Sequence, residues 1–268
     1  MTARTSPTAK PLPLAGIVFA MDVEADAFER LAVDRVRFTA ADLSIHEGIV
    51  AGRRVAWCVA GAGAAAAARA ARLIVAGHRP AVLISAGFAG GLDPALARGS
   101  VVLPRRAVST AGGPPRELVA VAGSGTGSNT TDVVIVSVDR VVTTVAAKRQ
   151  LAAATGAAVV DLETHAVAGV AHDHGLPCGS VRVISDDASQ ELPREIAALV
   201  EPASGMRRLG AALAAIGRRP RAALDMWQLW EHAVVDGRTL AAAIAAAVAG
   251  ISDGPRGIAP AGFSADPA

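Results

Sequence analysis

The chain has 268 residues, of which 52% are hydrophobic but only 3% aromatic, so we expect one large core built from small and aliphatic side chains. Its 26 basic and 24 acidic residues leave a formal net charge of +2. Because the arginines are scattered along the chain rather than gathered on one predicted face, this balance excludes nucleic acid as an expected partner.

The cysteines and the N-terminal segment indicate a cytoplasmic protein. Cys58 and Cys178 lie in or beside apolar runs, so they are predicted to be buried thiols rather than a disulfide framework or metal ligands. The segment MTARTSPTAKPLPL lacks the continuous apolar core of a signal peptide or a membrane span. We therefore expect a reducing, cytoplasmic location and no stable membrane insertion.

Apolar runs alternate with amphipathic segments from residue 14 onward, after a Pro-, Thr- and Ser-rich tail over 1–13 that is predicted to be disordered. Strands are predicted at 16–20, 45–50, 55–60, 81–86, 100–103, 133–138, 157–160 and 180–184. Helices are predicted at 24–31, 64–76, 144–154, 163–174 and 206–216. This alternation predicts an α/β protein with a mainly parallel sheet, as a single domain over 14–250.

Two further segments interrupt or follow this alternation. Residues 111–131 are rich in Gly, Pro, Ser and Thr and are predicted to form a mobile loop with a hairpin strand. Their GSGTGSN run lacks the Lys-Ser/Thr end of a phosphate-binding P-loop. A C-terminal helix is predicted over 220–250, with a packing stripe and an apolar tract too short to span a bilayer, which needs about 20 residues. The residues from 251 to 268 are predicted to be a disordered tail.

Carboxylates follow two of the predicted strands. Asp161 and Glu163 stand where one apolar run turns into a helix, and Asp186 and Asp187 end the run 180–184. In an open α/β sheet, ligands lie outside the carboxyl ends of the strands, so these side chains are expected to face one crevice. Acidic residues at such positions also serve as helix caps and turn formers, and Asp187 is the better candidate for a cap.

Five collinear segments resemble the nucleoside phosphorylase and nucleosidase superfamily, and more narrowly the methylthioadenosine/S-adenosylhomocysteine nucleosidases and the hopanoid-associated phosphorylases. They are AGIVFAMDVEADAFERL, VAWCVAGAGAAAAARAARLI, PAVLISAGFAGGLDPALARGSVVLP, VVIVSVDRVVTTVAAKRQL and VVDLETHAVAGVAHDHGLPCGSVRVISDDASQ. The resemblance implies a three-layer α/β/α fold with a mainly parallel mixed central sheet, a homodimer, a small-molecule nucleoside substrate, and neither metal nor organic cofactor.

The resemblance also implies roles for four polar residues. Asp186, in the Arg182-Val183-Ile184-Ser185-Asp186 pattern, matches the aspartate that donates a proton toward N7 of adenine, and Arg182 belongs to the same substrate-binding motif. Glu24 matches the glutamate that activates water in the hydrolytic branch. Glu163 matches the glutamate that binds the ribose hydroxyls. As alternatives, Glu24 is an exposed helix residue, Asp186 is a cap, and Glu163 is a favourable first-turn acid.

The remaining predicted contacts are apolar or backbone groups. Leu162 takes the place beneath the sugar that Met usually holds. The substrate-binding residues implied for the Gly-rich turns are Gly61, Phe88, Ala89 and Gly90, where Phe88 replaces a small polar residue and is expected to narrow or reshape the sugar pocket. Val141 and Val142 match the residues that pack against the purine, where an aromatic ring is common, so weaker stacking or a different specificity is expected.

Several functions remain open at this stage. Hydrolysis of a 5′-substituted adenosine leads, because the N-terminal segment lacks the G-D-P-x-R phosphate signature. The short segment between residues 102 and 133 implies an open 5′ side, which would suit phosphorolysis of adenosylhopane or a related nucleoside, with phosphate as co-substrate. A non-catalytic nucleoside-binding protein is the second alternative. A dinucleotide-binding dehydrogenase is discounted because AMDVEAD follows the first strand, and His172 and His174 lack a third metal ligand.

Overall fold

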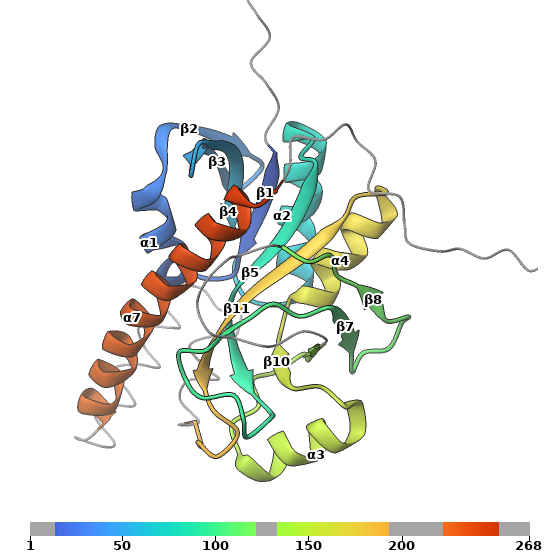
Figure 1. Ribbon diagram of the computed structural model, residues 1–268, viewed down its shortest axis with the longest axis vertical. Coiled ribbons are helices and arrows are strands. Elements are labelled where there is room, and N and C mark those ends of the chain that lie inside the picture. Colours follow the sequence, from blue (N-terminus) through green and yellow to red (C-terminus); the bar gives the residue numbers. More distant parts are fainter. Residues whose placement is uncertain (1–13, 122–132, 193–221, 252–268) are drawn as a thin grey trace, which may run out of the picture.

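The computed structural model describes residues 14–121, 133–192 and 222–251. The tails predicted at 1–13 and 252–268, the GSGTGSN run and the helix predicted at 206–216 lie outside these described residues. Within them the chain forms strands and helices in the predicted alternation (Figure 1).

Eleven strands form one sheet. They are β1 (Ala15–Phe19), β2 (Val33–Ala40), β3 (Leu43–Val50), β4 (Arg53–Val59), β5 (Val82–Gly91), β6 (Val101–Val102), β7 (Arg106–Ser109), β8 (Arg116–Glu117), β9 (Val134–Ser137), β10 (Val159–Asp161) and β11 (Cys178–Asp186). The helices of the described residues are α1 (Asp22–Leu31), α2 (Ala64–His78), α3 (Val145–Thr155), α4 (Thr164–Asp173) and α7 (Ala222–Ala249).

The sheet is mixed, with its parallel pairs at the centre. Its order is β2-β3-β4-β1-β5-β10-β9-β7-β8, with β11 on β5 and β6 on β11. The pairs β4–β1, β1–β5 and β5–β11 are parallel, whereas β2–β3, β3–β4 and β10–β5 are antiparallel. Strand β5 changes neighbour along one edge: it pairs with β1 over Val82–Ser85 and with β10 at Gly90 and Gly91. A change of neighbour of this kind is where α/β proteins commonly bind ligands.

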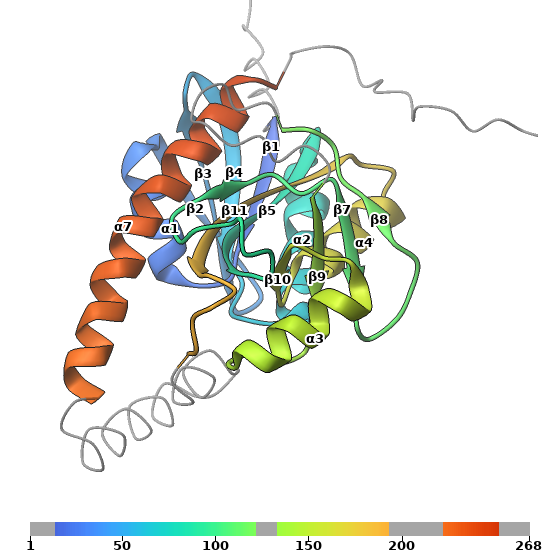
Figure 2. The ribbon, with the colours of Figure 1, turned by 60° about the horizontal axis from the view of Figure 1, so that its bottom comes forward.

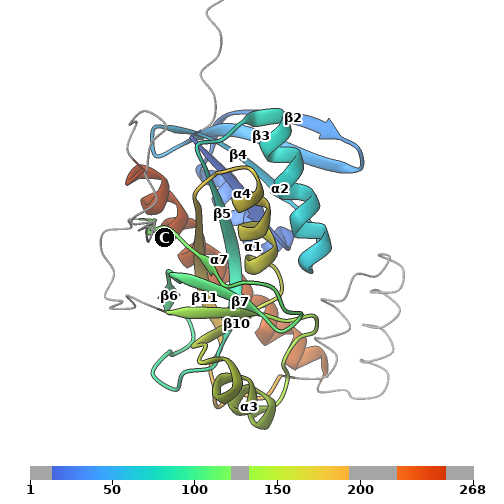
Figure 3. The same cartoon turned by 90° about the vertical axis from the view of Figure 1, so that its right-hand side faces the viewer.

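Helices cover both faces of this sheet, which makes three layers. Helices α2 and α4 pack together on one face, and α1 and α7 pack together on the other (Figures 1 and 3). Helix α3 lies beyond the carboxyl ends of β5 and β11, at the bottom of Figure 1 and toward the viewer in Figure 2. The predicted three-layer α/β/α architecture is therefore confirmed.

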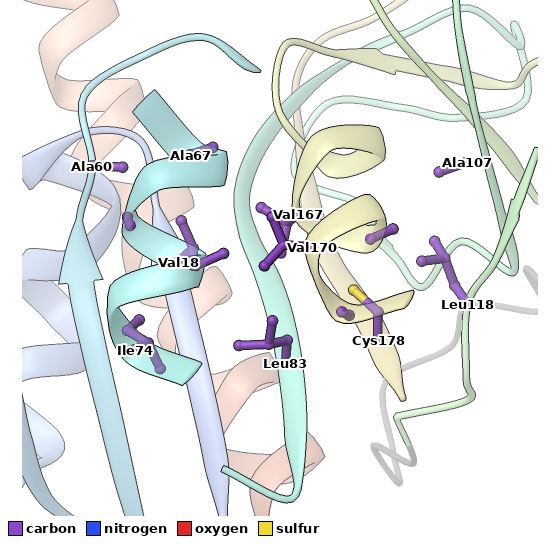
Figure 4. Packing of buried hydrophobic residues seen from close by; sticks show 14 of the residues in the cluster. Val18, Ala60, Ala67, Ile74, Leu83, Ala107, Leu118, Val167, Val170 and Cys178 are labelled. Carbon is purple, nitrogen blue, oxygen red and sulfur yellow. The ribbon is translucent and has the colours of Figure 1, made fainter. Parts of the chain in front are cut away.

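The core consists of three hydrophobic clusters. The α2–α4 cluster is built from small and aliphatic residues such as Val18, Ile74, Leu83 and Val167, as predicted (Figure 4). Cys58 and Cys178 are free and buried in it, and burial raises the pKa of their thiols to about 11 and about 12.

The second, the α1–α7 cluster, also holds aromatic rings, with Phe28 in contact with both Phe19 and Trp57. The third, the α3 cluster, joins Leu92, Val136, Ala157 and Val160 to residues of α3. The composition predicted the first and third clusters better than the second, which contains three of the eight aromatic residues of the chain.

Three features of the sheet differ from the prediction. Strand β5 runs to Gly91, through the Gly-rich stretch predicted to be a turn. Strand β2 was not predicted; nearly all of its residues are exposed, although Val36, Phe38 and Ala40 alternate with polar residues. Strand β7 was also missed, whereas β8, which pairs antiparallel with β7, lies within 111–131, where a hairpin strand was predicted.

Helix α7 matches the predicted C-terminal helix. By length and composition, its segment His232–Ala249 could cross a membrane, with a mean hydropathy of 1.3. In the fold, Leu240, Ile244 and Val248 of this segment are buried in the α1–α7 cluster. At Gly237 an added Cβ would lie 2.9 Å from the carbonyl oxygen of Val23, so α7 approaches α1 closely at this point.

Candidate active site

The centre of the candidate site is the Arg182 side chain of β11, which is 1% exposed. Its Nη2 atom donates hydrogen bonds to Ser85 Oγ at 2.5 Å and Thr164 Oγ1 at 2.7 Å, and lies 2.7 Å from Asp161 Oδ2. Asp161 also accepts hydrogen bonds from Ser137 and Thr164. A buried charge needs this kind of pairing, so Arg182 is held in one place by the ends of three elements.

Glu24 reaches this centre from the first turn of α1. Its Oε2 accepts the backbone N–H groups of Ala20 and Met21, both at 2.9 Å, and its Oε1 accepts that of Phe88 at 2.8 Å. Phe88 lies in β5 between the residues that pair with β1 and those that pair with β10. Burial raises the pKa of the Glu24 carboxyl, while these hydrogen bonds and Arg182 lower it in part. Glu24 is 2% exposed, so the alternative of an exposed helix residue is wrong.

Glu163 enters from the residue that precedes α4. Its Oε1 accepts the backbone N–H of Gly63 at 2.7 Å, and its Oε2 accepts that of Leu162 at 3.3 Å. Burial and, after it, the nearby Asp161 raise the pKa of its carboxyl to about 7, although Arg182 opposes the shift. Glu163 is therefore a carboxyl group that changes charge close to neutral pH.

Gly87 of β5 makes room for this group. A Cβ at Gly87 would lie 2.6 Å from both Arg182 Nη1 and Glu24 Oε1, so a larger residue would displace one of them. The three carboxyl groups of Glu24, Asp161 and Glu163 thus surround a single guanidinium. Burial is the main reason that the pKa values of Glu24 and Glu163 are raised, and at Glu163 the nearby carboxylate of Asp161 adds to it.

Asp186 belongs to a second group at the carboxyl end of β11. Its Oδ2 accepts a hydrogen bond of 2.6 Å from Lys148 Nζ, and its Oδ1 accepts one of 2.6 Å from Ser185 Oγ. It is 4% exposed, and burial raises the pKa of its carboxyl, while the bonds from Lys148 and Ser185 lower it. The alternative that Asp186 is only a cap is disfavoured, because it is Asp187 whose Oδ1 accepts the Ser189 N–H in the following turn.

The two groups occupy neighbouring positions on the same pair of strands. Arg182 pairs with Gly87, and Asp186 pairs with Gly90 after a β-bulge. A Cβ at Gly90 would lie 3.2 Å from Asp186 Oδ2. Because Gly87 and Gly90 are three residues apart, the groups are separated by about 10 Å along β5. The topology thus brings both sets of carboxylates to the carboxyl ends of β5, β10 and β11.

The other predicted contact residues flank these groups. Leu162 is half-buried beside Glu163, and Gly61 has a φ of +86° with open space where a Cβ would point. The Phe88 side chain packs against the α1–α7 cluster, so it is the Phe88 peptide, rather than its ring, that contacts Glu24. Val142 packs against the α3 cluster and Val141 is half-buried beside it. Ala89 and Gly90 lie in β5, where the Ala89 carbonyl accepts a hydrogen bond from Ser185.

Reasoning from the sequence missed Lys148 and assigned no role to Asp161, Ser85 or Thr164. One signal was available for Lys148, since it shares the face of α3 that carries Leu151 and Ala152, three and four residues later. Within the described residues, no group of three His, Cys, Asp or Glu side chains could hold a metal ion.

Comparisons with known proteins agree with this fold. Residues 15–217 match the family model described as the phosphorylase superfamily. A 5′-methylthioadenosine/S-adenosylhomocysteine nucleosidase from Neisseria meningitidis, in complex with methylthio-immucillin-A, has a TM-score of 0.68 and 19% identity, over 88% of this chain and 99% of that chain. The corresponding nucleosidase from S. pneumoniae, with a transition-state inhibitor, has a TM-score of 0.66 and 17% identity, over 88% and 98%.

Futalosine hydrolase of Helicobacter pylori has a TM-score of 0.61 and 17% identity, over 87% of this chain and 97% of that chain. At these identities the solved structures establish a shared fold, and they confirm the phosphorylase-like fold that the sequence predicted.

Proposed function

Because this chain belongs to the phosphorylase superfamily, we propose that it is an enzyme that cleaves the N-glycosidic bond of a purine nucleoside. The proposed substrate is a 5′-substituted adenosine, the proposed acceptor is water, and the products are adenine and the free sugar. The nucleosidases with a similar fold support this substrate class.

The observation that carries the proposal is the excess of carboxyl groups over cations around Arg182. Glu24, Asp161 and Glu163 surround one guanidinium that already pairs with Asp161. Breaking the bond between the anomeric carbon and the base creates positive charge on the sugar, which this excess of negative charge stabilises. A phosphate dianion would be repelled by the same carboxylates, so the charge balance favours water as the acceptor.

Three residues divide the chemistry. As the glycosidic bond breaks, its electron pair moves to the base, and Asp186 donates a proton to the base nitrogen that gains this charge. Glu163 binds the ribose hydroxyls, an interaction that strengthens as the sugar becomes positive. Glu24 accepts a proton from the attacking water, and the raised pKa of its carboxyl makes it a stronger base than an exposed glutamate.

Two alternatives concern the details of the reaction. The acceptor could be phosphate instead of water, and the substrate could carry a larger 5′ substituent. The resemblance to the hopanoid-associated phosphorylases favours a bulky 5′ substituent, because the segment between β6 and β9 is short. The same resemblance makes a cytoplasmic homodimer the proposed state. Light scattering after size-exclusion chromatography measures the oligomeric state directly.

The test is to incubate the full chain with adenosine, methylthioadenosine and S-adenosylhomocysteine, each with and without phosphate. Release of adenine together with free sugar is the expected result. Ribose 1-phosphate formed only with phosphate would overturn hydrolysis in favour of phosphorolysis. The Asp186→Asn variant is the matched control, since it removes the proton donor at nearly constant volume and should abolish release. If the wild-type chain binds these nucleosides but releases no base, the binding-protein alternative replaces this proposal.

A further inference from the structure

Lys148 is a buried charge for which the reaction described above has no role. It lies on α3 and is 0% exposed. Its ammonium group donates to Asp186 Oδ2 at 2.6 Å, to the Asp187 carbonyl at 2.5 Å and to the Gln190 carbonyl at 3.1 Å. A lysine has three N–H donors, so all three have a partner.

Lysine is rare in this chain, and the space around Lys148 suits an ammonium group better than a guanidinium. Of the 26 basic residues, only Lys10 and Lys148 are lysines, and the other 24 are arginines. An arginine would bring five donors on a planar fork, whereas Lys148 is enclosed and faces three acceptors. A compact ammonium fits this space, and a guanidinium would displace Asp186 or the backbone of residues 187–190.

We infer that Lys148 is a positioning residue for Asp186. Lys148 orients the Asp186 carboxyl group and limits the pH range in which that group keeps its proton. This inference rests on the proposed function, because it takes Asp186 as the proton donor. Lys148 and Ser185 each bind a different oxygen of Asp186, which prevents the carboxyl group from rotating. Each oxygen retains a second lone-pair direction for a proton or a base.

The charged groups around Asp186 are few. Burial raises the pKa of its carboxyl most strongly, the Lys148 ammonium lowers it, and the neighbouring Asp187 raises it. Its partner on β5 is Gly90, which carries no charge, and a Cβ at Gly90 would lie 3.2 Å from Asp186 Oδ2 and 3.0 Å from the uncharged Val160 of β10. Lys148 is therefore the cation that offsets burial, and its removal should let Asp186 keep a proton to higher pH.

A purely structural role is the competing explanation, since Lys148 also holds two backbone carbonyls. Two variants separate the roles. Lys148→Met removes the charge and keeps a similar length, whereas Lys148→Arg keeps the charge and changes the shape. For the Met variant we expect kcat to fall about 100-fold, because the Asp186 carboxyl group is no longer held in place. We also expect the basic limb of the pH profile of kcat/KM to move to higher pH. For the Arg variant we expect a lower kcat with the basic limb where it is in the wild type.

The double variant Lys148→Met/Asp186→Asn should be no slower than Asp186→Asn alone, because Lys148 acts through Asp186. An unchanged basic limb in a folded Met variant, or a further loss in the double variant, would overturn the inference. A pH titration of carboxyl-labelled aspartate by ¹³C NMR, with the Asp186 signal assigned from Asp186→Asn, gives a readout that needs no turnover. There the Met variant should show a raised Asp186 pKa.

The outcomes distinguish this inference from the proposed function. If the wild type releases no base, the proposed function fails, and with it the catalytic role of Lys148, whatever the NMR titration shows. If the wild type is active but neither the basic limb nor the Asp186 signal moves in the Met variant, only the positioning role fails.

Discussion

The substitution Glu163→Gln tests the electrostatic account of the site through stability, without any substrate. Burial and Asp161 raise the pKa of Glu163 from an ordinary value of 4.5 to about 7. A carboxyl group with a raised pKa in the folded state stabilises the fold fully below the unfolded value. That stability is lost as the pH rises from the unfolded value through the folded one. The folded protein should therefore become less stable between about pH 4.5 and pH 7 because of Glu163.

The magnitude follows from the size of the shift. Each pKa unit corresponds to about 1.4 kcal/mol, so ionising Glu163 costs the fold about 3 kcal/mol at alkaline pH. Glutamine cannot ionise, and its side-chain oxygen can still accept the hydrogen bond that Gly63 donates to Glu163 Oε1. The longer bond from Leu162 is lost, which lowers stability equally at every pH. Relative to the wild type, the variant should gain about 2 kcal/mol between pH 5 and pH 8.

Urea denaturation at pH 5, 6, 7 and 8 measures this difference for the wild type and the variant. Glu191→Gln is the matched control, since Glu191 is exposed and its substitution should leave the pH dependence unchanged. A stability difference between Glu163→Gln and the wild type that stays constant across these pH values would refute the reasoning, because it would mean that Glu163 ionises in the fold without penalty.

Three other substitutions probe the same group. Glu24→Gln should lower base release at least about 100-fold with an unchanged circular dichroism spectrum, and near-normal turnover would remove Glu24 from the mechanism. Gly87→Ala should destabilise the fold by about 1 to 3 kcal/mol in urea and reduce activity, because its Cβ would overlap Arg182 and Glu24; a neutral effect would contradict the close approach. Asp161→Asn should cost about 3 kcal/mol, measured in the same way, because it removes the carboxylate that pairs with the buried Arg182; unchanged stability would contradict this pairing.

Most of the fold could be predicted because the central strands are continuous apolar runs. Strand β1 and helix α2 begin within one residue of the positions expected from pattern alone. Strand β2 was missed because it lies at the exposed edge of the sheet and is not a continuous apolar run, although Val36, Phe38 and Ala40 alternate with polar residues. The Gly-rich end of β5 was mistaken for a turn, because its glycines provide space for Arg182 and Asp186 rather than a reversal of the chain.

The candidate site was predictable where it depends on strand ends and not where it depends on tertiary contacts. Glu163 and Asp186 follow apolar runs, so their approximate location could be inferred from spacing. Lys148 lies 38 residues from Asp186 in sequence, and only the packing of α3 against the end of β11 reveals their contact. The pKa values of the carboxyl groups depend on burial and on Arg182, neither of which a local pattern contains.

The two ends of the site differ in charge in the way that the proposed reaction requires. Around Arg182 the carboxyl groups outnumber the cation, so this end stabilises a positive charge that develops nearby. At Asp186 one carboxyl group faces one ammonium, so the carboxylate left after proton donation is paired and no isolated buried anion remains. Exchanging the two charge arrangements would disable both steps. A neutral group around Arg182 would not stabilise the positive charge on the sugar, and an excess of carboxylates around Asp186 would make it hold its proton too tightly. The Arg182 and Asp186 groups are about 10 Å apart along β5, which allows the two charge arrangements to coexist in one sheet.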